Sequence, residues 1–143
     1  MNFSYYDIPL SFDKMLSKKE PDLCSIKESI ANYIHLIATS YFGECTFDER
    51  FGCAIWNIDF DNLTSANKMR DKIASSISSS IRLKEKRLSK VSVEVSIKQE
   101  EFTNKRKLNR IKKRVDITIH GTVKQTNEPF AALEQFYIAP LSY

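Results

Sequence analysis

The sequence is poor in the residues that mark several common protein classes. Its 143 residues include only 3 glycines and 4 prolines, which does not fit a sandwich of many short strands or a long disordered linker. The cysteines, Cys24, Cys45 and Cys53, are odd in number and form no CxxC pair, which argues against a disulfide framework or a zinc knuckle. His35 and His120 lie far apart in the chain. We therefore expect no metal site and no cofactor.

Long apolar runs are missing as well. No apolar stretch reaches the roughly 18 residues that a membrane-spanning helix needs. Residues 1–16 have no basic start followed by an apolar core, so they do not form a signal peptide. A chain of this length corresponds to one domain. The composition thus predicts a cytoplasmic, single-domain protein that inserts into no membrane.

The net charge of +4 is unevenly distributed. Seven basic residues against Glu101 give the segment 101–114 a charge of +6, so the other residues together carry −2. This basic segment predicts contact with an acidic neighbour, with nucleic acid as the alternative partner. Its cations are Lys105, Arg106, Lys107, Arg110, Lys112, Lys113 and Arg114.

Two helices are expected in the first two thirds of the chain. Ser25 and Glu28 form a capping box that starts the first helix, whose apolar residues recur every three or four positions until it ends near Gly43. The second helix starts at Thr64 or Ser65 and repeats an apolar residue every four positions: Met69, Ile73, Ile77 and Ile81. Residues 1–21 are expected to form an irregular arm before a domain of residues 22–143. Residues 43–63 are predicted to form a loop with a short extended piece.

The apolar period then changes to two, which predicts strands. Residues 91–97 and 115–123 each alternate apolar and polar side chains, and a third extended stretch covers residues 130–139. The basic segment joins the first two strands and is long enough to extend them as a protruding ribbon. The fold class is therefore α+β, with two helices packed on one face of a small, largely antiparallel sheet.

Two short segments are more specific: residues 43–52 (GECTFDERFG) after the first helix, and residues 83–87 (LKEKR) at the end of the second. With this element order they resemble the GPW, or gene-twenty-five-like, family of phage baseplate wedge proteins, whose bacterial members include TssE of type VI secretion systems. Cys45, Glu49 and Lys86 depart from the family pattern of Arg, Pro and Pro. The residues that match are Gly43, Glu44, Phe51, Gly52, Glu85 and Arg87.

The resemblance implies a structural baseplate subunit of a contractile injection machine. Such a subunit joins wedge proteins (TssF- and TssG-like) to the contractile sheath and templates sheath assembly. Glu85 and Arg87 would help to clamp helices of neighbouring proteins; the alternative is an internal helix cap and surface pair. Gly43 and Gly52 are expected to shape turns, and Phe51 to fill the core.

The C-terminal stretch has apolar groups on both faces, which is typical of a strand that is covered twice or of an edge that awaits a partner strand. The resemblance implies that this stretch contacts the sheath by strand addition. The partner-binding side chains expected here are Phe130, Leu133, Phe136 and Ile138.

Two other function classes fit the sequence less well. Glycoside hydrolysis needs two carboxylates that face one cleft about 5–9.5 Å apart, and Glu44, Asp48 and Glu49 offer only carboxylates in a loop. We therefore expect no enzymatic activity. Nucleic-acid binding through the basic segment is the alternative function, although the segment lacks the interleaved aromatic residues that stack on bases.

Overall fold

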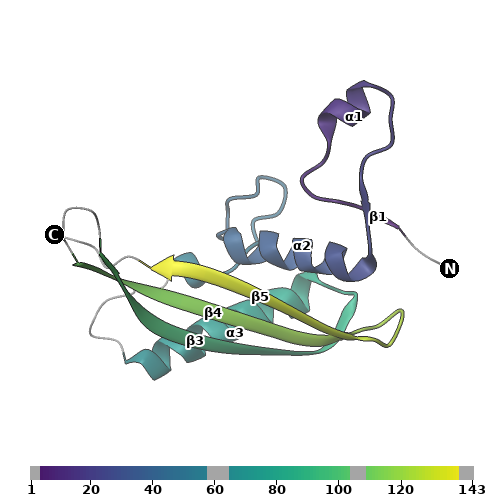
Figure 1. The fold of residues 1–143 in the computed structure, drawn as a ribbon. Helices are drawn as coiled ribbons and strands as arrows, with labels where there is room; N and C mark the ends of the chain where they lie inside the picture. Colours follow the sequence, from purple (N-terminus) through teal and green to yellow (C-terminus); the bar gives the residue numbers. More distant parts are fainter. Residues whose placement is uncertain (1–3, 58–64, 104–108, 139–143) are drawn as a thin grey trace.

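The computed structural model describes residues 4–57, 65–103 and 109–138 and has an α+β fold (Figure 1). Its main elements are two long helices, α2 (Ile26–Thr39) and α3 (Ala66–Lys84), and three long strands, β3 (Leu88–Thr103), β4 (Asn109–Val123) and β5 (Pro129–Ile138). The shorter elements are β1 (Tyr5–Tyr6), α1 (Phe12–Leu16), β2 (Leu23–Cys24) and the 3₁₀ helix η1 (Ile55–Asn57). No helix among the described residues is long and apolar enough to cross a membrane.

Helix α2 begins at the predicted capping box. The Ser25 hydroxyl accepts a hydrogen bond from the Glu28 amide at 3.3 Å, and the Glu28 carboxylate accepts one from the Ser25 amide at 2.8 Å. The helix ends at Thr39, so the prediction of an end near Gly43 was wrong. The helix ends early because Ser40 adopts an extended backbone conformation, and the Ser40 carbonyl accepts a hydrogen bond from the Cys53 amide at 3.0 Å.

Helix α3 confirms the second predicted helix. Ser65 is its N-cap and accepts a hydrogen bond from the Lys68 amide. The four predicted stripe residues are all buried. A four-residue repeat places side chains on one face of a helix, so α3 presents a single apolar surface to the sheet.

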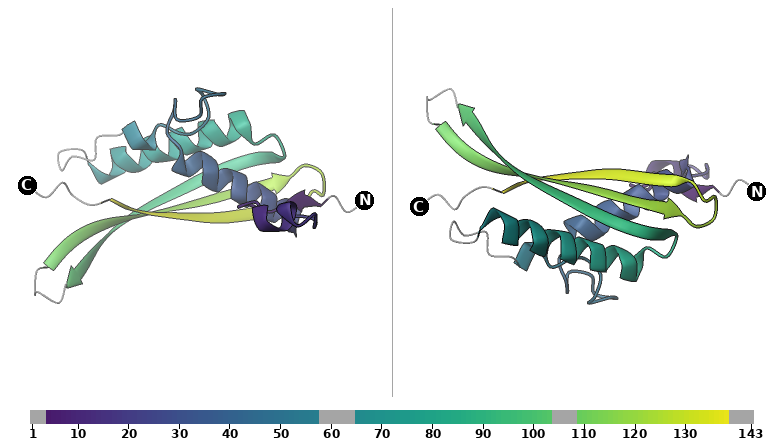
Figure 2. Two further views of the ribbon diagram at one scale, coloured as in Figure 1. Left: turned by 90° about the horizontal axis from the view of Figure 1, so that it is seen from above. Right: turned by 90° about the horizontal axis from the view of Figure 1, so that it is seen from below.

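The main sheet has the order β3-β4-β5 and is antiparallel throughout. Both long helices cover the same face of it, as predicted, with α3 beside β3 and α2 nearer β5 (Figure 2). The core lies between the helices and this face. Its buried strand residues are Leu88, Val91, Val115, Ile117, Ile119, Val123 and Phe130.

Strands β3 and β4 run on beyond β5. The last pair between β4 and β5 is Lys113 with Ile138, whereas pairing between β3 and β4 continues to Thr103 with Asn109 (Figure 2). Residues 100–103 and 109–112 therefore form a two-stranded ribbon, which confirms that the basic segment extends the strands. Lys105, Arg106 and Lys107 lie outside the described residues.

The first residues of the chain are not irregular, contrary to the prediction. Strand β1 pairs with β2, and α1 lies between them in an N-terminal arm of residues 4–24 that stands away from the sheet (Figure 1). The Asp7 amide donates to the Asp22 carbonyl at 2.8 Å and closes the arm at its base. Periodicity could not reveal these elements because two-residue strands and a five-residue helix are too short to show a period.

Candidate partner-binding site

The corner between α3 and β3 brings the predicted pair Glu85 and Arg87 together. Glu85 is the C-cap residue of α3 and is only 2% exposed. Its carboxylate accepts hydrogen bonds from the Arg87 amide and Nε, both at 2.9 Å, and from Arg87 Nη2 at 2.7 Å. Arg87 Nη1 also donates to the Ser29 hydroxyl at 2.8 Å, which ties the corner to α2.

The N-terminal arm covers the same corner. The Tyr5 ring lies 5.2 Å from the Arg87 guanidinium carbon, a cation–π distance. The hydrogen bonds that Arg87 donates to the Glu85 carboxylate raise the pKa of Arg87. The contacts agree with an internal helix cap, but the pair is not the surface pair of that alternative, because the Glu85 carboxylate is buried against its own domain. The sequence did not indicate the roles of Tyr5 and Ser29, because both lie far from this corner along the chain.

The family-like residues of the 43–52 loop have backbone roles. The Glu44 carboxylate accepts a hydrogen bond from the Tyr41 amide at 3.0 Å, and the Gly43 amide donates to the Glu49 carbonyl at 3.0 Å. Gly43 and Gly52 both have positive φ, and a Cβ on Gly52 would lie 2.6 Å from the Ser40 carbonyl oxygen. Only glycine fits there.

Phe51 is not part of the core, contrary to the prediction. It is half-buried and packs against the Tyr33 ring of α2 at a centroid distance of 5.7 Å. The chain turns at Gly52 toward Ser40 and places Cys53 in the core, whereas Phe51, before the turn, lies outside the core cluster. Phe51 therefore fastens the loop to the helix.

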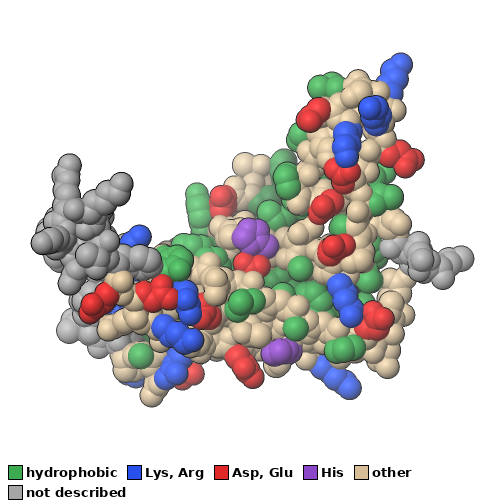
Figure 3. Space-filling model, viewed as in Figure 1, with side chains coloured by type: hydrophobic (Ala, Val, Ile, Leu, Met, Phe, Trp, Pro, Cys, Tyr) green, Lys and Arg blue, Asp and Glu red, His purple; other side chains and the backbone are tan. Residues whose placement is uncertain are grey.

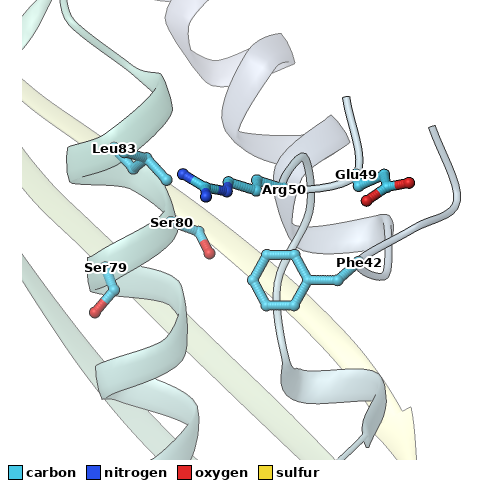
Figure 4. Close-up of a pocket in the computed structure, with 6 residues that line it drawn as sticks. All are labelled: Phe42, Glu49, Arg50, Ser79, Ser80 and Leu83. Carbon is cyan, nitrogen blue, oxygen red and sulfur yellow. The ribbon is translucent and has the colours of Figure 1, made fainter. Parts of the chain in front are cut away.

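The loop carboxylates are committed to different contacts. Asp48 forms an ion pair with Lys84 and accepts a hydrogen bond from the Arg50 amide at 3.1 Å; the Lys84 contact above all lowers the pKa of Asp48. A general acid for glycoside hydrolysis needs a raised pKa instead. Glu44 is bound to the Tyr41 amide, and the Glu49 carboxylate points away from the nearby groove (Figure 4). These three side chains do not form a pair of facing carboxylates.

Strand β5 forms one edge of the main sheet and divides its predicted partner-binding residues between two faces. Phe130 is buried, and Phe136 and Ile138 pack against the core, Phe136 with its ring 5.5 Å from the Trp56 ring. These three side chains face the helices. Leu133 alone among the four points outward, where it is 57% exposed.

The sequence pattern was not enough to identify one acidic residue on the inner face of β5. Glu134 shares the parity of the core residues, and its carboxylate lies 2.8 Å from His35 Nδ1 on α2, with the Glu134 side chain only 11% exposed. Inward-pointing charges are one device that protects edge strands from random association. In the sequence, Glu134 occupies a position of the strand alternation at which the other inward-facing residues are apolar. This break in the pattern is the signal that could have revealed it.

The basic segment is less basic than its sequence indicates. Arg114 forms ion pairs with Glu100 on β3 and with Asp116 on its own strand, the latter at 3.0 Å. Glu100 also lies opposite Lys112 in the strand register. Figure 3 shows acidic and basic side chains interspersed at this end of the sheet. The side chain of Arg110 lies outside the described part, so Lys112, Lys113 and Arg114 are the predicted cations that the structure places.

In the part of the chain that the structure describes, the domain is a helix-backed antiparallel sheet with β5 at one edge and a protruding ribbon, and a buried ion pair lies at one corner. The family model for the baseplate wedge protein gp25 matches residues 24–128. The chain belongs to this family, and its role is that of a structural component of the baseplate of a contractile tail or injection machine.

One solved structure has the same fold. A crystal structure of a candidate tail lysozyme from Geobacter sulfurreducens is similar, with a TM-score of 0.59 and 23% sequence identity over 85% of this chain and 98% of that one. A search of curated proteins finds no significant match. The N-terminal arm lies almost entirely outside the segment that the family model matches.

Proposed function

We propose that this chain is the TssE-like baseplate subunit of a type VI secretion system. It joins TssF- and TssG-like wedge proteins to the contractile sheath and works by protein contacts rather than catalysis. The observation that supports this most is the position of β5, which pairs with β4 on one side and with no other strand of the described residues on its second side.

An open edge suits strand addition. Its unpaired amides and carbonyls can pair with a strand from another chain, and flanking side chains then give specificity. Leu133 and Tyr137 both stand outward beside this edge and are more than half exposed. A sheath strand that pairs with β5 would cover these two side chains and extend the sheet, which is how the subunit would template the first ring.

The ribbon and the corner supply further contacts in this proposal. The basic segment, from Lys105 to Arg114, docks on an acidic neighbour in the baseplate. Arg87 keeps 28% of its side chain exposed beside Tyr5, so a wedge protein can reach the guanidinium although Glu85 is covered. Ion pairing of Arg114 with Glu100 and Asp116 reduces the charge available for phosphates, which favours a protein partner over nucleic acid.

A sheath-initiation assay tests the edge contact. Gln135→Pro removes one backbone donor from β5, and Gln135→Ala is its matched control. We expect the proline variant to fold, as judged by circular dichroism, but to seed no sheath when mixed with purified sheath subunits. Normal seeding by a folded Gln135→Pro variant would contradict the proposal.

A second variant covers the case in which proline disrupts the fold. Leu133→Lys combined with Tyr137→Lys leaves the backbone intact and places two charges beside the edge, a natural way to block strand pairing. Leu133 is exposed, and the exposed Tyr137 also interacts with Arg114, so the free energy of unfolding should fall by no more than about 1 kcal/mol. Sheath seeding should be lost, and its persistence would exclude β5 as the template.

A further inference from the structure

A groove lies between the 43–52 loop and the C-terminal half of α3, away from the β5 edge. Its volume is about 300 Å³, enough for one or two large side chains. Figure 4 shows the lining residues, which come from both sides of the groove: Phe42, Glu49, Arg50, Ser79, Ser80 and Leu83.

The groove and its surroundings expose unusual amounts of apolar surface. Phe42 and Leu83, on opposite walls, are 41% and 51% exposed, and Phe47 at the tip of the same loop is 95% exposed. A fully exposed phenylalanine makes no contribution to the stability of its own domain. Contiguous apolar surface of this kind on a folded domain marks a site of protein contact.

The charge inside the groove is positive. The Arg50 side chain extends across it toward Ser80 and Leu83, whereas the Glu49 carboxylate points away (Figure 4). The guanidinium forms no hydrogen bond or ion pair with any described residue; it acts on the Asp48 carboxylate only through electrostatic attraction. Asp48 is already paired with Lys84, so the donors of Arg50 remain available to an incoming carboxylate.

We infer that this groove binds a segment of another protein that carries a large apolar side chain next to a carboxylate. The apolar side chain fills the space between Phe42 and Leu83, and the carboxylate pairs with Arg50. This contact is independent of the sheath contact at β5 and gives the subunit a second docking surface. It assigns a role to Phe42, Arg50 and Leu83, which the fold does not require.

Short capped peptides test the chemistry directly. The full chain, labelled with ¹⁵N and ¹³C, is titrated with acetyl-Ala-Phe-Glu-Ala-amide and followed by NMR. Acetyl-Ala-Phe-Lys-Ala-amide and acetyl-Ala-Ala-Glu-Ala-amide are the comparison peptides. We expect shifts in Arg50 Nε–H, the Leu83 methyls and the Phe42 ring, and binding by the Phe-Glu peptide about threefold or more tighter than by the Phe-Lys peptide.

Variants separate the two parts of the inference. Arg50→Gln should abolish the preference for Glu over Lys while leaving residual binding, and Leu83→Ala should weaken binding of both phenylalanine peptides. Leu16→Ala, an exposed leucine on the distant α1, is the control and should change neither.

Three results would overturn the inference. Absence of localised shifts up to about 10 mM peptide would exclude a docking site, since even millimolar affinity would then be detected. Equal binding of the Glu and Lys peptides would remove the role of Arg50. Unchanged binding by Leu83→Ala would place the contact elsewhere.

Discussion

Arg87 donates two hydrogen bonds to the buried carboxylate of Glu85, from Nε at 2.9 Å and from Nη2 at 2.7 Å, at the point where α3 passes into β3. Because Arg87 also reaches Ser29 on α2, one side chain joins the end of one helix to the start of the other. The pair therefore stabilises the domain itself, and any partner meets it only through the exposed part of Arg87.

Removing either member of this pair should destabilise the isolated domain, but unequally. Arg87→Ala leaves a buried carboxylate without its partner and should lower the free energy of unfolding by about 3–5 kcal/mol. Glu85→Ala leaves a guanidinium that water can reach and should lower it by about 1–3 kcal/mol. Urea titration measures both, with the exposed Lys86→Ala as control. Loss of less than about 0.5 kcal/mol in Arg87→Ala would show that the pair is not structural.

Gly52 should tolerate no side chain. Gly52→Ala combines a φ of 119° with a Cβ only 2.6 Å from the Ser40 carbonyl oxygen, so the Tyr41–Cys53 bridge has to shift. We expect a loss of about 2–4 kcal/mol in thermal or urea unfolding. Gly43→Ala is the matched control, because its φ is also positive but nothing lies within 4 Å of the added methyl; it should cost about 1–2 kcal/mol. Equal losses for the two variants would contradict the steric account.

The ion pair of Asp48 and Lys84 should make the stability of the domain decrease as the pH falls into the acid range. Lys84 lowers the pKa of Asp48 below its usual 3.8, so the folded state favours the charged carboxylate. The contribution is therefore fully present above pH 3.8 and disappears as the pH falls through the lowered value. Asp48→Asn should lose this part of the pH dependence, seen as a flatter change of melting temperature below pH 4. Parallel wild-type and Asp48→Asn profiles would exclude the ion pair.

Hydrolysis of peptidoglycan should be absent despite the name of the similar structure. Glu44, Asp48 and Glu49 are bound to different groups or point apart, so no two of these three carboxylates face a common cleft. Purified protein incubated with peptidoglycan should release no muropeptides. The triple variant Glu44→Gln, Asp48→Asn, Glu49→Gln is the control: release by the wild type that this variant abolishes would establish an enzyme.

Periodic patterns predicted the parts of the fold whose structure is set locally. The stripe from Met69 to Ile81 and the capping box at Ser25 determine α3 and α2 by themselves, and alternation determines the strands. The end of α2 escaped prediction because a hydrogen bond from Cys53, distant in sequence, competes with the last helical turn. The contacts of Arg87 with Tyr5 and Ser29 escaped for the same reason.

Only part of the candidate site could be predicted from the sequence. Because side chains alternate along a strand, the sequence places Phe130, Phe136 and Ile138 on one face of β5 and Leu133 on the other. It does not show which of these two faces the helices cover. The charge count could not show that Arg114 is paired with Glu100 on the neighbouring strand β3, since that pairing depends on strand register. The docking groove combines Phe42 with Leu83, which only the folded chain brings together.

Co-purification from the native cell tests the central claim most directly. The tagged wild-type chain and the Leu133→Lys, Tyr137→Lys variant are isolated in parallel, and bound proteins are quantified by mass spectrometry. We predict that both retain the TssF- and TssG-like wedge proteins, whereas only the wild type retains sheath subunits. Equal recovery of sheath by the two chains would contradict the account, as would a wild-type chain that brings down no wedge protein.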